Sequence, residues 1–145
     1  MNLQTVIIER EFAHPLEVIF RAFVDPEIST KWIAPDGFQC IENVNEARVG
    51  GISRTVLQDR EGNTSVCEGN IIEFIENQEF EIEFWLQFGD FKIEGLKNKT
   101  TFKQSDLGTK VIVELLVPEG DFVTGATAGW NQSFDNLEKQ LEQSS

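Results

Sequence analysis

The chain has 145 residues, of which 40% are hydrophobic and 26% are charged, and its net charge is −13. This composition is typical of a folded globular protein and excludes extensive disorder, and the length predicts a single domain over residues 1–145. Twelve basic residues stand against 25 acidic ones. The balance argues against nucleic acid or an anionic membrane surface as a partner, because phosphates are bound by neutralising them with lysine and arginine.

The N-terminal stretch Met1–Ile8 has neither the basic start nor the long apolar core of a secretory signal. No apolar run approaches the roughly 20 residues that are needed to span a bilayer. We therefore expect a cytoplasmic protein without membrane insertion. Cys40 and Cys67 are then expected to be free thiols, and their spacing fits neither a CxxC motif nor a zinc site.

The first quarter of the chain predicts one strand followed by two short helices. Apolar and polar residues alternate over Thr5–Phe12, which predicts the strand. Pro15 suits a first helical position, and the apolar spacing after it predicts a helix over Leu16–Val24. Asp25-Pro26-Glu27 is a start signal for a second helix, which we expect to end before Pro35.

From Gly37 onward the pattern changes to strands that are separated by turn signals. The predicted strands are Phe38–Val44, Ile52–Arg60, Ser65–Ile75, Glu79–Phe88, Leu96–Gln104 and Thr109–Val117. Along Glu79–Phe88 every second residue is phenylalanine, isoleucine or leucine, and most of the others are glutamate. One face of this strand is therefore expected to be buried, and Trp85 falls on the opposite face.

Close to the C-terminus, Trp130, Phe134, Leu137 and Leu141 are spaced four, three and four residues apart, as on one apolar stripe of a helix. A curved antiparallel sheet cannot bury its concave face alone, so this helix is expected to cover it. We predict an α+β fold in which about seven antiparallel strands wrap around a long C-terminal helix, with two short helices after the first strand. The apolar interior of such a fold is a usual place for a small-molecule site.

Three stretches of the sequence carry a family resemblance. They are Ile8–Pro15 continuing through Val18–Phe20, Ala22-Phe23, Asp25-Pro26 and Lys31-Trp32 to Pro35–Phe38; Arg48–Gly51 with Arg54, Asp59–Gly62 and Gly69; and Gly129-Trp130 with Ser133-Phe134 and Leu137. In this order they resemble the family of activator of heat-shock-protein-90 ATPase homologues, within the START-like, birch-pollen-allergen-like superfamily. The chain departs from the family pattern at Ile33-Ala34, where a second tryptophan and a glycine are common, and at Glu76-Asn77-Gln78, where a proline is common.

The resemblance implies the helix-grip fold and a cavity between sheet and long helix that holds an apolar or lipid-like molecule. It implies no fixed catalytic residues, and the family name comes from a co-chaperone. The residues that we predict to line the cavity are Trp32, Phe38, Arg54, Phe80, Phe84, Phe102, Trp130, Phe134 and Leu137. The aromatic members either line a pocket or fill an ordinary core, while Arg54 either orients a ligand carboxylate or is an ordinary surface arginine.

No constellation of residues supports catalysis. His14 is the only histidine, tyrosine is absent, and neither a nucleophile elbow nor a phosphate loop is present. Glu68 and Glu114 lie in apolar strand runs, and either they are buried acids with a raised pKa or they face solvent on a one-sided sheet. We predict no catalytic residue, no metal and no cofactor.

Three functions remain open. The first is a binding protein for a small apolar or lipid-like ligand, and the second is a co-chaperone-like module that docks a chaperone or another protein. The third, with the least support, is an enzyme that acts on an apolar substrate. Both a monomer and a homodimer are compatible with the sequence.

Overall fold

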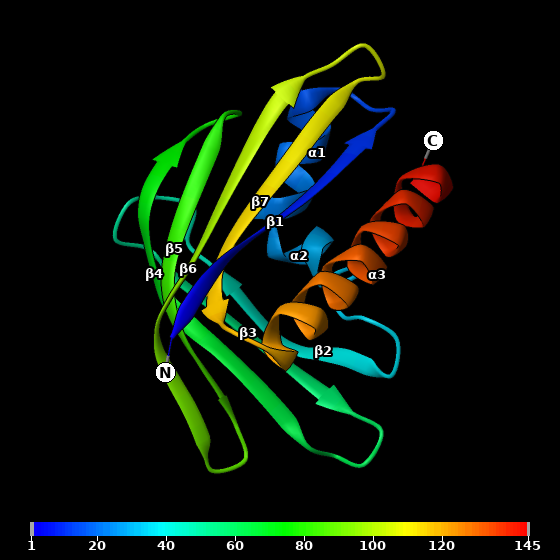
Figure 1. Ribbon diagram of the computed structural model, residues 1–145. Helices are drawn as coiled ribbons and strands as arrows, with labels where there is room; N and C mark the ends of the chain where they lie inside the picture. Colours follow the sequence, from blue (N-terminus) through cyan, green and yellow to red (C-terminus); the bar gives the residue numbers. More distant parts are fainter. Residues whose placement is uncertain (1, 145) are drawn as a thin grey trace.

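The computed structural model describes residues 2–144, which form a curved sheet around a long helix (Figure 1). The strands are β1 Leu3–Phe12, β2 Phe38–Asn45, β3 Ile52–Asp59, β4 Thr64–Ile75, β5 Glu79–Phe88, β6 Phe91–Gln104 and β7 Thr109–Pro118, and the helices are α1 Leu16–Val24, α2 Pro26–Ser29 and α3 Asp121–Ser144. The seven strands lie in the order β1-β7-β6-β5-β4-β3-β2, and all neighbours are antiparallel. The predicted α+β helix-grip architecture is confirmed.

Strand β6 begins five residues earlier than predicted, at Phe91 rather than Leu96. The alternation is interrupted at Gly95, which adopts a φ of +77°. There β6 carries one extra residue, because the pairing passes from Phe84↔Leu96 to Leu86↔Ile93. A glycine with positive φ is the usual first residue of such a bulge. The break in the apolar alternation at Gly95 therefore marks a bulge within one strand and not the start of a new strand.

Helix α2 is shorter than predicted and ends at Ser29, well before Pro35. The Asp25 side chain accepts a hydrogen bond from the Glu27 amide at its start, as the sequence indicated. The chain continues through turns that bury the Trp32 side chain, whose indole N–H donates to the Ala22 carbonyl at 3.0 Å. Trp32 follows Ile28 by four residues, as on one face of a helix. A turn holds it in place, and the helix does not continue to this position.

The strand register separates the inner face of the sheet from the outer face. Val113 of β7 is fully buried and pairs with Thr100 of β6, which in turn pairs with Phe80 of β5. Side chains directly opposite one another share a face, so the inner face continues through Phe84 on β5 to Gly69 on β4. The same counting puts every residue between these positions on the outer face.

The core fills one end of the inner face, between β1, β7, β6 and the three helices. Phe134 of α3 is fully buried and packs edge-on against Phe12 at 5.7 Å, while Phe20 of α1 lies 5.0 Å from Phe102. Helix α3 lies along β1 and β7 (Figure 1). The aromatic rings therefore join α1, α3 and the sheet into one packed cluster.

Polar contacts fix the position of α3. Arg10 of β1 forms ion pairs with Asp135 at 2.9 Å and Glu138 at 3.0 Å. On another side of the helix, the Ser133 hydroxyl donates to the Ile33 carbonyl at 2.8 Å and the Asn136 amide donates to the Ala34 carbonyl at 3.0 Å. The second half of α3 is thus tied both to β1 and to the chain after α2.

Candidate functional site

The structure divides the nine predicted cavity residues into three groups. Five are at most 8% exposed and belong to the packed core: Trp32, Phe80, Phe102, Phe134 and Leu137. Phe84 and Trp130 are half-buried, and Phe38 is 42% exposed at the start of β2. Arg54 lies on the outer face, so it does not meet the other eight. A role of these residues in ligand binding remains a prediction.

Arg54 is held by two carboxylates on the outer face. Its guanidinium lies 3.0 Å from Glu42 of β2 and 3.0 Å from Glu68 of β4. These two hydrogen bonds raise the Arg54 pKa further above its ordinary value. Glu114 also lies on the outer face, where it pairs in register with the exposed Ile7. The acid–base role considered for Glu68 and Glu114 and the ligand-orienting role considered for Arg54 therefore find no support on the inner face.

A second part of the inner face is not closed by the core. We call it the open half of the inner face, and its side chains share three properties: they are inward-facing, uncharged and half-buried. They are Leu57 on β3, Cys67 on β4, and Phe84 and Leu86 on β5. Apolar side chains that keep part of their surface in water at the concave side of a sheet are typical of a ligand-contacting surface.

Three phenylalanines, Phe88, Phe91 and Phe122, contact one another, and we call them the phenylalanine rim. Phe88 and Phe91 flank the β5–β6 turn, and each is 38% exposed. Phe122 in the first turn of α3 stacks on Phe91 at 5.9 Å and lies 6.2 Å from Phe88. Rings from β5, β6 and α3 therefore gather beside the β5–β6 turn.

The first half of α3 carries small residues on the side that continues toward the rim. Gly125 and Gly129 precede Ser133 by two turns and one turn, and Ser133 faces Ile33. An added Cβ at either glycine would meet no atom within 4 Å. Both positions therefore face open space, and Gly125 is exposed.

The two glycines give a stability prediction. Gly125→Ala and Gly129→Ala should each raise the free energy of unfolding by about 0.5–1 kcal/mol, because alanine removes the entropic cost of a glycine inside a helix and meets no neighbour. Urea unfolding of each variant measures the effect. Gly69→Ala is the matched contrast: its Cβ would collide with the Glu83 carbonyl oxygen of the neighbouring strand, so it should destabilise. Destabilisation by all three substitutions would contradict the free space in front of α3.

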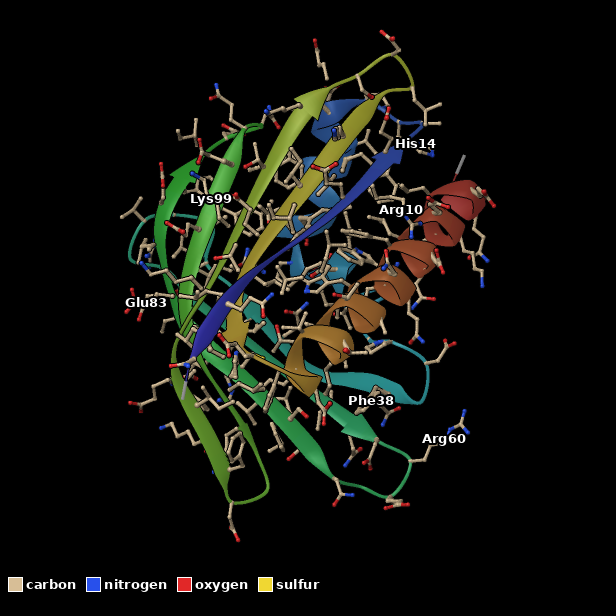
Figure 2. The ribbon with its side chains drawn as sticks, viewed as in Figure 1. Arg10, His14, Phe38, Arg60, Glu83 and Lys99 are labelled. Atoms are coloured by element: carbon tan, nitrogen blue, oxygen red, sulfur yellow. The ribbon has the colours of Figure 1, made fainter. Side chains whose placement is uncertain are left out.

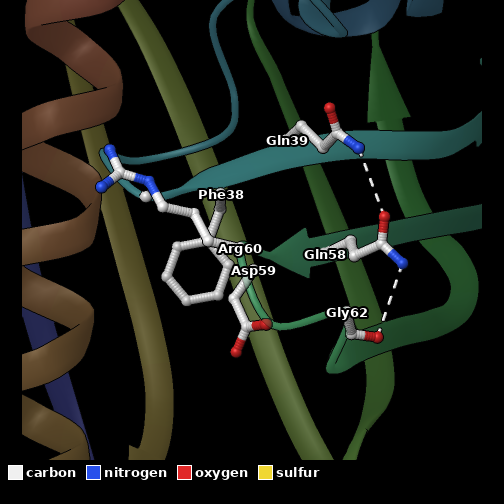
Figure 3. A pocket seen from close by; sticks show the side chains of 7 residues that line it. Phe38, Gln39, Gln58, Asp59, Arg60 and Gly62 are labelled. Carbon is white, nitrogen blue, oxygen red and sulfur yellow. Dashed lines mark hydrogen bonds between the residues drawn. The ribbon is translucent and has the colours of Figure 1, made fainter.

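A hollow of about 430 Å3 lies between the start of β2 and the β3–β4 turn (Figure 3). Its lining consists of Gly37, Phe38, Gln39, Gln58, Asp59, Arg60 and Gly62. Gln39 donates to Gln58, which donates to the Gly62 carbonyl, so both amides are engaged. Figure 3 shows Arg60 and the Phe38 ring on the side of α3. Apart from the Phe38 ring, the side chains that line this hollow are polar or charged.

The Asp59 carboxylate in this hollow serves the β3–β4 turn. Its burial would raise the pKa, but hydrogen bonds from the Asn63 backbone and side chain, together with those from the Glu61 and Gly62 amides, outweigh it and lower the Asp59 pKa. Asp59 therefore stays ionised, and its carboxylate oxygens already accept hydrogen bonds from the β3–β4 turn. Arg60 is exposed and forms no ion pair with any residue that the structure describes.

The remaining chemical candidates lie apart from one another. His14 is half-buried at the start of α1, where its backbone carbonyl accepts a hydrogen bond from Thr109 at 2.8 Å. Cys67 lies on the open half of the inner face, and burial raises its thiol pKa to about 11. Between residues 2 and 144 no three histidine, cysteine or acidic side chains are placed to hold a metal ion. No helix in the same range is long and apolar enough to cross a membrane.

The fold and the inner face define a helix-grip protein of the START-like class. Structures with the same architecture include an AHSA1 protein from Silicibacter pomeroyi, with 18% identity, a TM-score of 0.86 and coverage of 98% of this chain and 100% of that one. A protein from Rhizobium leguminosarum matches with 25% identity and a TM-score of 0.83 over 98% and 96% of the two chains. A protein from Chromobacterium violaceum matches with 23% identity and a TM-score of 0.80 over 93% and 94%.

The sequence identifies the family within this class. The sequence profile described as activator of Hsp90 ATPase homolog 1-like protein matches residues 13–142. The chain belongs to this family, as the three stretches of resemblance predicted. No functionally curated protein matches the sequence.

Proposed function

We propose that the protein binds a small apolar or amphipathic molecule on the open half of its inner face, beneath the first half of α3. The observation that carries the proposal is the contrast between the two ends of the interior. At one end large side chains such as Phe134 and Leu137 are fully buried, while at the other Leu57, Phe84 and Leu86 remain half-buried. Covering this apolar surface would stabilise a complex by roughly 25 cal/mol for each Å2 removed from water.

The inward positions also suggest which ligands fit. From β3 to β6 they carry apolar side chains and the uncharged polar residues Ser53, Thr55, Ser65, Asn98 and Thr100. A buried charge on the ligand would find no partner of opposite sign there and would pay its desolvation cost uncompensated. We therefore expect the buried part of the ligand to be neutral, with hydroxyl and amide groups available to orient it.

Thermal unfolding against a panel of fatty alcohols, isoprenoids, sterols and aromatic metabolites tests the proposal. A ligand at 100 times its dissociation constant adds about 2.7 kcal/mol to stability, which should raise Tm by roughly 5–10 °C. The matched variants are Leu86→Lys and Gln87→Lys, because these neighbours face inward and outward respectively. The ligand shift should disappear in the first variant and persist in the second.

Two results would contradict the proposal: a flat response across the panel, or a shift that both lysine variants retain. If Leu86→Lys does not fold, Leu86→Gln introduces a polar group without a charge and serves the same comparison. The proposal places the protein in the cytoplasm as a monomer or homodimer, and size-exclusion chromatography distinguishes these two states.

A co-chaperone-like contact is the second candidate. Edge strand β2 and its neighbour β3 expose apolar side chains, with Ile41 at 49%, Val44 at 39% and Ile52 at 45%. Exposed apolar residues beside an unpaired strand edge are typical of a protein-contact surface. Stimulation of ATP hydrolysis by an Hsp90-type chaperone, abolished in Val44→Glu but retained in Leu86→Lys, would favour this function over ligand binding.

A further inference from the structure

The outer face of the sheet carries a second hollow, also of about 430 Å3, on the side opposite the inner face. It crosses β3 to β6 and is lined by Ile52, Glu68, Gly69, Asn70, Glu83, Phe84, Trp85, Glu94 and Gly95. Gly95 contributes no side chain, and a Cβ there would meet no atom within 4 Å. Figure 2 shows Glu83 on this side of the sheet, pointing away from α3.

The indole of Trp85 already attracts a cation from within the chain. The Lys92 ammonium lies 4.5 Å from the Trp85 ring centroid, within the range of a cation–π interaction. Lys92 pairs with Gln87, on the side of Trp85 toward the β5–β6 turn, and does not line the hollow. Glu83 and Asn70 lie in the other direction along the strands. The hollow therefore adjoins the side of the indole that Lys92 leaves uncovered.

The charges around the hollow favour a positive ligand. Its lining includes three glutamates but no lysine or arginine. Arg54 pairs with Glu68 at 3.0 Å, and Lys92 pairs with Glu94 at 3.5 Å. Glu83 is exposed and has no ion pair among residues 2–144. Lys97 of β6 stands opposite Glu83 in register but forms no ion pair with it, so this carboxylate remains available to a ligand in a protein whose net charge is −13.

We propose that this outer hollow binds a small organic cation of the alkylammonium class. The ammonium group would lie against the side of the Trp85 ring opposite Lys92, with Glu83 as its counter-charge. A methylated ammonium fits best, because it needs no hydrogen-bond acceptor and interacts favourably with an aromatic face. This site is separate from the proposed inner-face site, so either can fail without the other.

Tetramethylammonium chloride is the probe, followed through the tryptophan indole N–H signals in ¹H–¹⁵N NMR spectra. The protein has three tryptophans, and Trp85→Phe assigns the relevant signal. We expect the Trp85 signal to shift saturably, while the signals of Trp32 and Trp130 stay in place. Sodium chloride at equal ionic strength is the control. Glu83→Gln should weaken binding roughly twofold to fivefold, the range of an exposed ion pair. Lys92→Ala should strengthen it, because it removes a positive charge that already interacts with the same ring.

Three outcomes would overturn the proposal. The first is a Trp85 shift no larger than that caused by sodium chloride, and the second is a saturable shift of Trp130 in place of Trp85. The third is an affinity for tetramethylammonium that Glu83→Gln leaves unchanged. The comparison variant is Glu81→Gln, at the next outward glutamate on β5, and the proposal fails if the two variants both bind like the unmodified protein. Binding of an oligolysine peptide without binding of tetramethylammonium would likewise reject a small-molecule site and assign the surface to a protein partner.

Discussion

Phe134→Ala should lower the free energy of unfolding by about 3–5 kcal/mol, the usual loss when a fully buried phenylalanine is truncated. Phe134 is 0% exposed and lies at the meeting point of α3, β1 and α1. Its ring contacts those of Phe12 at 5.7 Å and Trp130 at 5.5 Å, and the Arg10 guanidinium lies 5.6 Å from its centroid. Alanine would leave a cavity that rings held by three separate elements cannot close.

Urea unfolding measures this loss as a lower midpoint at constant m-value. Phe122→Ala is the matched control, because Phe122 lies on the same helix but is only half-buried in the phenylalanine rim. We expect it to cost about 1 kcal/mol. If Phe134→Ala is too unstable to purify, Phe134→Leu keeps most of the volume and should cost about 1–2 kcal/mol. Equal losses at positions 134 and 122 would contradict the division into a packed end and an open end.

Strands and helices could be predicted from the sequence wherever the apolar residues of a long segment recur with a single period. The alternation over β5 and the stripe on α3 are of this kind, and both elements formed as predicted. The sequence alone did not resolve segments where two short-range signals compete. Gly95 interrupted the alternation of β6, and Trp32 continued a helical spacing past the end of α2. In both cases tertiary packing decided what local propensity left open.

The candidate site was harder to predict because burial depends on register between strands. Phe80 and Phe84 are two positions on the same face of β5, yet Phe80 is 8% exposed in the core and Phe84 is half-buried beyond it. Alternation identifies the face but not which helix covers each part of it.

Two departures from the family pattern prove compatible with the fold. Ile33 and Ala34 receive the hydrogen bonds of Ser133 and Asn136 through their backbone carbonyls, so the docking of α3 does not depend on their side chains. At the β4–β5 turn, Asn77 adopts a φ of +62°, a conformation in which asparagine is enriched. An asparagine turn thus replaces the turn that a proline commonly makes there.

Cys67 should react about 90 times faster with iodoacetamide at pH 10 than at pH 8. Burial raises its thiol pKa from an ordinary value near 9 to about 11, and only the thiolate reacts, so its rate should rise roughly tenfold for each pH unit over this interval. An ordinary thiol, already half-ionised near pH 9, should gain only about tenfold. The Cys40→Ser variant isolates the Cys67 rate, and mass spectrometry follows the modification.

The same shift has a consequence for stability. Between the two pKa values the unfolded chain releases the Cys67 proton while the folded protein keeps it, so stability falls as pH rises through this window. With an unfolded value near 9 and a folded value of about 11, the loss at pH 10 is about 1–2 kcal/mol. Circular dichroism at pH 10 therefore accompanies the rate measurement, because modification of unfolded protein would mimic a reactive thiol.

Cys67 then reports on the proposed ligand site directly. Its thiol lies on the open half of the inner face, opposite Leu86 in register, so a ligand seated there would cover it. At a saturating concentration of any compound that raises Tm, modification of Cys67 should slow at least about tenfold, because only the small unliganded fraction reacts. Cys40 pairs in register with Leu57 at the edge of the same face, so it is replaced by serine and only Cys67 is measured. Unchanged modification of Cys67 in the presence of a stabilising ligand would place that ligand elsewhere on the protein.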